Sequence, residues 1–226
     1  MPFATEAAKH LENLKKIGVE VTIAKGGPFD FQNVYYLIEG TAALTHFTEN
    51  GEQSSFLYFR PGMLLNFLRP VIAHTGIGSK IAIKRFANLD HVIYAKTDCR
   101  CICINGKIML DYLSKNPQYY TLLLQSLSEN LINVLALSTD IVTKPACVRV
   151  CQLLQDFMSD DTPPQIPRYL TYTEIAFYLH LHVITVTKIF KALKESGIIC
   201  KKGWTTIVTD PEGLQKIADG TKELFY

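Results

Sequence analysis

The stretch LTYTEIAFYLHLHVITVTKIFKALKESGII, Leu170–Ile199, has the pattern of two helices separated by a short turn. Thr171 can cap the first helix, and Glu174 three residues later completes a capping box. Chain reversal is expected at His180-Leu181-His182, and Gly197 is placed to end the second helix. Apolar positions recur at helical spacing, namely Ile175, Ala176 and Leu179 in the first helix and Val186, Ile189, Phe190 and Leu193 in the second. The pattern predicts a helix-turn-helix.

The residues that follow predict a wing. Ile198–Cys200 and Trp204–Val208 flank Lys201-Lys202-Gly203 as two short strands, and Asp210-Pro211 starts a last helix. This order is typical of proteins whose second helix enters the major groove of DNA. Five lysines against one glutamate give His182–Lys202 a formal net charge of +4, which suits phosphate attraction. A solvated helix face has the same charge pattern, so charge alone leaves both interpretations open.

Residues 106–143, which precede this unit, predict two helices. A short one covers Lys107–Ser114, and a long one begins with Asn116 as N-cap and Pro117 as its first residue. A heptad seam runs along the long helix through Leu124, Leu127, Leu131, Val134, Ser138 and Ile141. Additional apolar positions, Leu122, Leu123, Ile132, Leu135 and Leu137, predict a second buried face. We expect the seam to be a dimer interface; the alternative is a single buried helix in a monomer.

Residues 17–105 have the pattern of a β domain. Short apolar runs at 34–38, 42–48, 55–59, 80–86, 91–95 and 100–104 alternate with glycine-containing turns. Asn50-Gly51 is the strongest hairpin signal, because both residues tolerate positive φ. The expected fold class is therefore α+β. A jelly-roll-like double-stranded β-helix (1–115) is followed by a dimerisation helix (116–143) and a winged helix-turn-helix (144–226).

Composition excludes several other classes of protein. The 226 residues are 48% apolar, enough for packed cores, and the net charge of +2 is too small to predict a nucleic-acid partner. We see no apolar run of about 18 residues and no signal-peptide pattern, so a cytoplasmic protein with reduced thiols and no membrane partner is expected. The one His-x-His, His180-Leu181-His182, falls in a helix turn and does not suit a cupin metal site. With no nucleophile elbow or phosphate loop, we expect neither an enzyme nor a cofactor.

Segments along nearly the whole chain resemble the CRP/FNR family of transcription regulators. The matching segments are YYLIEGTAAL (35–44), ENGEQ (49–53), FRPGMLL (59–65), AKTDC (95–99), CVRVCQLL (147–154) and the opening stretch. HVITVTKIFKAL (182–193) is most similar to the branch that includes regulators of reductive dehalogenation. The resemblance implies a cyclic-nucleotide-binding-like roll, a dimerisation helix and a DNA-binding winged helix, in this order.

The resemblance also places the DNA-reading residues. Where cyclic-AMP-responsive members carry an Arg-Glu pair, this chain has Val183-Ile184, which can contact thymine methyl groups but cannot make the bidentate guanine contact. We expect an A·T-rich site read by His182, Val183, Ile184, Thr185 and Lys188. Phosphate contacts are assigned to Thr171, Thr173, Lys191, Lys201 and Lys202. The alternatives are that His182 only caps the helix and that Val183 and Ile184 belong to the core.

Cyclic AMP does not fit the roll. Asn66-Phe67 and Leu89-Asp90 stand where nucleotide-binding members have Gly-Glu and Arg-Ser, and Val134-Leu135 replaces the adenine-binding Thr-Ser pair. A small organic effector is expected instead, in a pocket lined by Leu64, Leu65, Asn66, Phe67, His91, Leu123, Leu127 and Asn130. Asn130 and Leu127 occupy the positions of the ligand-binding lysine and tyrosine of the dehalogenation branch, so that ligand chemistry does not carry over. The alternative is a filled pocket and no effector.

The cysteines do not predict a metal centre. The first is Cys99, so the N-terminal iron–sulfur cluster of the oxygen-sensing branch is excluded. Cys99, Cys101 and Cys103 share one strand face, where packing is favoured over a redox or metal role. The expected partners are double-stranded DNA, a second copy of the chain and an effector, with RNA polymerase as a further candidate. The alternative is a regulator whose roll or winged helix docks on protein.

Overall fold

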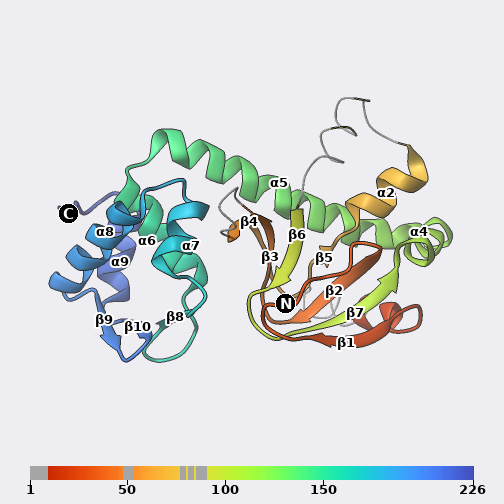
Figure 1. Ribbon diagram of the computed structural model, residues 1–226, viewed down its shortest axis with the longest axis horizontal. Helices are drawn as coiled ribbons and strands as arrows, with labels where there is room; N and C mark the ends of the chain where they lie inside the picture. Colours follow the sequence, from red (N-terminus) through yellow and green to blue (C-terminus); the bar gives the residue numbers. More distant parts are fainter. Residues whose placement is uncertain (1–9, 48–52, 77–79, 81–83, 85–90) are drawn as a thin grey trace. The chain divides into compact units, whose positions relative to one another are not determined.

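The computed structural model describes residues 10–47, 53–76, 80, 84 and 91–226 (Figure 1). The chain divides into two compact units, Met1–Asn133 and Val134–Tyr226, and the division falls inside the long helix α5 (Tyr120–Thr143). Strands dominate the first unit, and helices with a small sheet form the second. The predicted α+β class, with a β-rich N-terminal part, a long helix and a C-terminal helix-turn-helix, is confirmed.

Two antiparallel sheets form the first unit. One has the order β1 (Val19–Ile23), β7 (Cys99–Asn105), β2 (Asn33–Glu39), β5 (Leu64–Leu65). The other has the order β4 (Gln53–Phe59), β3 (Ala42–Phe47), β6 (His91–Ala95). The pairing of β3 with β4 agrees with a hairpin, although its predicted turn, Asn50-Gly51, lies outside the described residues.

Side-chain alternation along β2 gives the first unit two cores. Tyr35 and Leu37 belong to the core shared with β3, β4 and β6, whereas Val34 and Tyr36 belong to a core closed by the helices that follow β7. Successive side chains of a strand point to opposite faces, so a strand buried on both faces joins both cores. The roll is therefore packed against α4 (Gly106–Lys115) and the start of α5.

One helix in the roll was not predicted. Leu68–Thr75 forms α2, with Pro70 in its first turn, where a missing N–H costs nothing, and Gly76 at its C-cap with φ 61°. The strand predicted at 80–86 is wrong at the described residues, because Lys80 and Lys84 have helical backbone. The rest of that stretch, and Leu89-Asp90, lie outside the described residues.

The long helix starts slightly later than predicted. Pro117–Tyr119 is a 3-10 turn, and α5 follows it directly. Asn116 does not cap through its side chain; its Nδ2 donates instead to the Tyr112 carbonyl at 2.9 Å, which ties the turn to α4.

The second unit contains α6 (Ala146–Phe157), β8 (Gln165–Ile166), α7 (Tyr172–Tyr178), α8 (Val183–Glu195), β9 (Ile199–Lys202), β10 (Thr205–Val208) and α9 (Pro211–Ala218). The strands form a sheet in the order β8-β10-β9, so the predicted wing is present and gains an unpredicted third strand. Asp210 caps α9, its Oδ1 accepting from the Gly213 N–H at 2.8 Å. Gly197 adopts φ 72° just beyond α8, as predicted.

Candidate nucleic-acid interface and effector cavity

Helices α7 and α8 form the predicted helix-turn-helix (Figure 1). Thr171 caps α7, its Oγ1 accepting from the Glu174 N–H at 3.1 Å. The chain then bends by 117° between the two helices, which is the geometry of this motif. His180, in the turn, takes the left-handed conformation with φ 53°, and the Leu181 N–H donates to the Ala176 carbonyl at 2.8 Å.

A buried arginine on α6 stabilises the turn between α7 and α8. Arg149, on α6, is only 8% exposed, and its Nη1 donates to the Leu179 carbonyl at 2.6 Å. That carbonyl closes α7, so Arg149 satisfies a group that the helix end leaves open. This role was not predicted, although Arg149 stands out as a charged residue next to Val150 in a largely apolar helix pattern.

The residues predicted to read bases lie together at the start of α8. Its buried stripe is Val186, Ile189, Phe190 and Leu193, as predicted. Val183 is 41% exposed and Ile184 is 71% exposed, so the alternative that both belong to the core is wrong. His182 is the N-cap residue, but among the described residues its side chain makes no capping hydrogen bond. His182 and Lys188 are exposed and Thr185 is half-buried, so the first turns of α8 present a mixed apolar and polar surface.

The residues predicted to hold phosphates come from three elements around that surface. Thr171 and Thr173 lie at the start of α7, Lys191 on α8, and Lys201 and Lys202 on β9, and all five are exposed. Two of the lysines have neighbours within the chain. Lys191 Nζ lies 3.8 Å from Glu195 Oε1, and Lys201 Nζ lies 5.2 Å from the Tyr172 ring centroid.

A groove of about 470 Å³ runs between α7 and the wing. We call it the wing groove; it is lined by Ile166, Pro167, Arg168, Leu170, Thr171, Tyr172, Phe190, Lys201, Trp204 and Thr206. Arg168 and Trp204 are additions to the predicted set. Arg168 Nη2 donates to Thr205 Oγ1 at 3.3 Å, and Trp204 is 89% exposed at the end of the wing.

The first unit contains an apolar cavity of about 260 Å³. Its lining residues are Leu44, Phe56, Leu57, Phe59, Asn66, Phe67, Leu68, Arg69, His91, Ile93 and Asn130. Four predicted pocket residues, Asn66, Phe67, His91 and Asn130, are among them. The structure places the other four elsewhere: Leu64 and Leu65 are fully buried in the two cores, Leu123 packs beside one core, and Leu127 is exposed.

Two polar residues of the cavity are held in defined ways. Asn66 takes a left-handed conformation, φ 62°, and its Nδ2 donates to the Asp30 carbonyl at 3.1 Å. Asn130 Oδ1 is buried and, among the described residues, accepts no hydrogen bond. A buried oxygen without a donor is costly unless a bound molecule or water supplies one.

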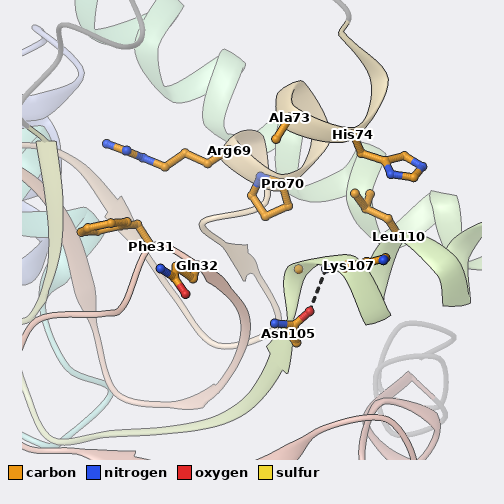
Figure 2. Close-up of a pocket in the computed structure, with 10 residues that line it drawn as sticks. Phe31, Gln32, Arg69, Pro70, Ala73, His74, Asn105, Lys107 and Leu110 are labelled. Carbon is orange, nitrogen blue, oxygen red and sulfur yellow. Dashed lines mark hydrogen bonds between the residues drawn. The ribbon is translucent and has the colours of Figure 1, made fainter.

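A second, more open pocket of about 430 Å³ lies between α2 and the start of α4. Figure 2 shows His74 and Lys107 at its rim and the Asn105 side chain accepting from the Lys107 N–H, at 3.1 Å. Arg69 lines both pockets, and its guanidinium lies 5.0 Å from the Phe31 ring centroid.

The seam of α5 is largely exposed. Leu124, Leu127, Leu131, Val134 and Ser138 are exposed and Ile141 is half-buried. Ile132 and Leu135 are exposed as well, so the second buried face predicted to include them is wrong there; Leu122 and Ser126 are the buried residues of the helix. The described residues therefore leave a row of apolar side chains exposed along the seam of α5.

The surroundings of the β7 thiols favour packing over a redox or metal role. Cys99 and Cys101 are fully buried, and burial raises the pKa of all three thiols, that of Cys101 to about 12. A nucleophilic or metal-binding cysteine needs a thiolate, so these positions favour packing. Within the described ranges, no group of three or more His, Cys, Asp or Glu side chains is placed to hold a metal ion. In those same ranges no single helix is long and apolar enough to cross a membrane, and only the bent pair α7 and α8 passes that test jointly.

Comparison with known proteins gives a family match for part of the second unit and a similar fold for the chain. Residues 148–217 match the Crp-like helix-turn-helix domain. No curated protein sequence matches the chain. The CRP/FNR-family regulator TTHA1359 of Thermus thermophilus is similar in structure, with a TM-score of 0.70 at 18% identity over 89% of this chain and 98% of that one.

Two further structures are similar. The c-di-GMP responsive regulator CLP of Xanthomonas campestris has a TM-score of 0.68 at 16% identity, over 89% of this chain and 98% of its own. CprK complexed with OCPA has a TM-score of 0.55 at 16% identity, over 92% and 93%. At these identities the three structures establish a shared fold.

Proposed function

We propose, from the premise that this chain carries a Crp-like helix-turn-helix domain within the fold of the CRP/FNR-family regulators, that it is a sequence-specific, homodimeric transcription regulator. One observation carries the proposal. The first turns of α8 expose His182, Val183 and Ile184 while its opposite stripe is buried, which leaves that face available for a DNA groove. A regulator of this kind acts in the cytoplasm.

The exposed face favours a particular site chemistry. Val183 and Ile184 can pack on thymine methyl groups, and Thr185 and Lys188 can bond base edges. No arginine stands at these positions to make a bidentate guanine contact. The expected site is therefore rich in A·T pairs.

Phosphate contacts are assigned to Thr171, Thr173, Lys191, Lys201 and Lys202. Neutralised phosphates release counterions, so binding weakens steeply as salt rises. Replacing Lys202 by alanine should weaken binding to all sequences alike and reduce the salt slope by about 2, because the proposed dimer loses one phosphate contact in each subunit. Replacing Thr185 by alanine should instead reduce discrimination between sequences, with the salt slope unchanged. Titration of labelled duplexes at several salt concentrations tests both statements, and a salt-independent affinity would overturn the assignment.

The exposed seam of α5 supports a two-fold dimer. A soluble protein rarely leaves a long apolar stripe in water, and heptad spacing suits a second copy of the same helix. A two-fold dimer predicts an inverted repeat with half-sites about 34–36 Å apart.

The cavity supports control by a small organic molecule. Its walls are mostly apolar, and Asn130 Oδ1 accepts no hydrogen bond from the described residues. A largely apolar ligand that carries an N–H or O–H group therefore fits. Asn66-Phe67 in place of a Gly-Glu pair argues against cyclic AMP. Thermal shifts with a panel of small aromatic and heterocyclic donors test this. A compound that stabilises the protein should lose its effect in Asn130→Leu and keep it in Asn133→Leu, which removes an exposed amide one turn away.

A second candidate is a regulator whose winged helix docks on protein. The clustered lysines of α8 and β9 favour DNA, because the DNA backbone carries closely and regularly spaced negative charges. Binding to a protein partner that is indifferent to salt, with no binding to any duplex, would favour this alternative.

A further inference from the structure

Trp204 stands at the tip of the wing. Gly203, with φ 61°, turns the chain between β9 and β10, and Trp204 follows it with 89% of its surface exposed. It is the single tryptophan of the chain. An isolated exposed apolar residue needs no explanation, so the indole alone carries no conclusion.

The surroundings of Trp204 give the second observation. The indole lines the wing groove together with Thr171 and Lys201, two residues already assigned to phosphates, and with Arg168. The residues that line the groove include two cations and no acid. The partner that fits is therefore an anion carrying flat or apolar groups for the indole to cover.

The sugar–phosphate backbone of duplex DNA has this composition. Deoxyribose offers an apolar face, and phosphates accept from cations and from an indole N–H. Because Lys201 and Thr171 belong to the surface assigned to DNA, the wing groove continues that surface beyond α8.

We propose that Trp204 packs against the DNA backbone beside the segment occupied by α8, while Arg168 and Lys201 bond the adjacent phosphates. The contact lengthens the footprint of each subunit without reading sequence. This inference rests on the proposed function, since it requires the second unit to bind DNA.

The single tryptophan makes the test direct, because all indole emission comes from this position. Mixed-sequence duplex is titrated into the intact protein, with binding followed by anisotropy of a labelled duplex and Trp204 by emission and acrylamide quenching. The expected result is a changed emission and protection from acrylamide in step with binding. Trp204→Ala should bind about tenfold more weakly, and Trp204→Phe, which keeps a flat apolar ring, should retain most of the affinity. Phe225→Ala, which truncates an aromatic residue 84% exposed outside the groove, should bind normally.

The outcomes separate this inference from the proposed function. Binding with unchanged emission, and equal affinity of Trp204→Ala and the parent protein, would overturn the Trp204 contact and leave the regulator proposal standing. Absence of any duplex binding by anisotropy, both with and without an extract that supplies small molecules, would overturn both. Emission that responds to an acidic peptide but not to duplex would assign the groove to a protein partner and likewise overturn the contact.

Discussion

The backbone N–H of Leu64 donates a hydrogen bond to Ser126 Oγ at 2.9 Å, and both residues are fully buried. The bond ties β5 to α5. Asn66 follows β5 directly, and Asn130 lies one turn beyond Ser126, so the same bond fixes two polar residues of the cavity relative to each other. Ser126 thus links β5, which leads into the cavity wall at Asn66, to the helix that carries the exposed seam.

Removal of that link should destabilise the first unit. Ser126→Ala leaves a buried N–H without an acceptor, which costs about 1–3 kcal/mol of unfolding free energy. Ser128→Ala, on the exposed side of the same helix, should cost almost nothing. Urea unfolding followed by circular dichroism measures both variants. Equal midpoints for the two would contradict a structural role for Ser126.

Leu131 tests the seam. A glutamate at this position, now 55% exposed and central in the heptad pattern, places a charge in the expected interface. Leu131→Glu should convert a dimer to a monomer without unfolding it, because the side chain is not part of the core of its own chain. Ala136→Glu, on the opposite side of α5, is the matched control and should remain dimeric. Analytical ultracentrifugation at several protein concentrations measures the oligomeric state of both variants. If Leu131→Glu remains dimeric, the dimer interface lies elsewhere.

His180 holds a conformation that suits glycine better. A left-handed backbone costs a residue with a Cβ about 1–2 kcal/mol, partly offset by the greater freedom of glycine in the unfolded chain. His180→Gly should therefore stabilise the second unit by about 0.5–1 kcal/mol, and His180→Ala should not stabilise it. Thermal unfolding of the three proteins is the measurement. A destabilised His180→Gly would mean that the imidazole makes a contact stronger than the strain.

Because the Cys101 thiol is buried, we expect the free energy of unfolding to fall at alkaline pH. Burial first, and then the neighbouring thiols Cys99 and Cys103, raise its pKa to about 12. In the unfolded chain the thiol loses its proton at about pH 8.5. The contribution of the protonated Cys101 thiol to the free energy of unfolding is therefore complete below about pH 8.5. It declines as the pH rises towards 12, by at most about 1.4 kcal/mol per pH unit. Cys101→Ala should flatten the fall of the urea midpoint between about pH 8 and 10. An unchanged slope in the variant would contradict the raised pKa.

The parts that the sequence predicted well depend on local signals. Thr171 with Glu174, Gly197, and Asp210 with Pro211 each set one helix end through contacts within a few residues, and all three appear where expected. Helix α2 was missed because its apolar pattern is short, covering only the eight residues Leu68–Thr75.

The cavity was predicted less well because its lining depends on packing over long range. Leu64 and Leu65 neighbour Asn66 in sequence, but strand alternation sends them into the two cores. Phe56, Leu57 and Phe59 enter the cavity from β4, a strand the sequence did not connect with α5. The role of Arg149 was missed for the same reason, since its acceptor is Leu179, 30 residues away.

Selection from a random duplex library by the purified protein tests the central claim most directly. The account predicts enrichment of an A·T-rich inverted repeat, and loss of that enrichment in Thr185→Ala or Lys188→Ala while the fold is intact. A failure to enrich any sequence, with and without an extract that supplies small molecules, would contradict a DNA-reading role for the exposed face of α8.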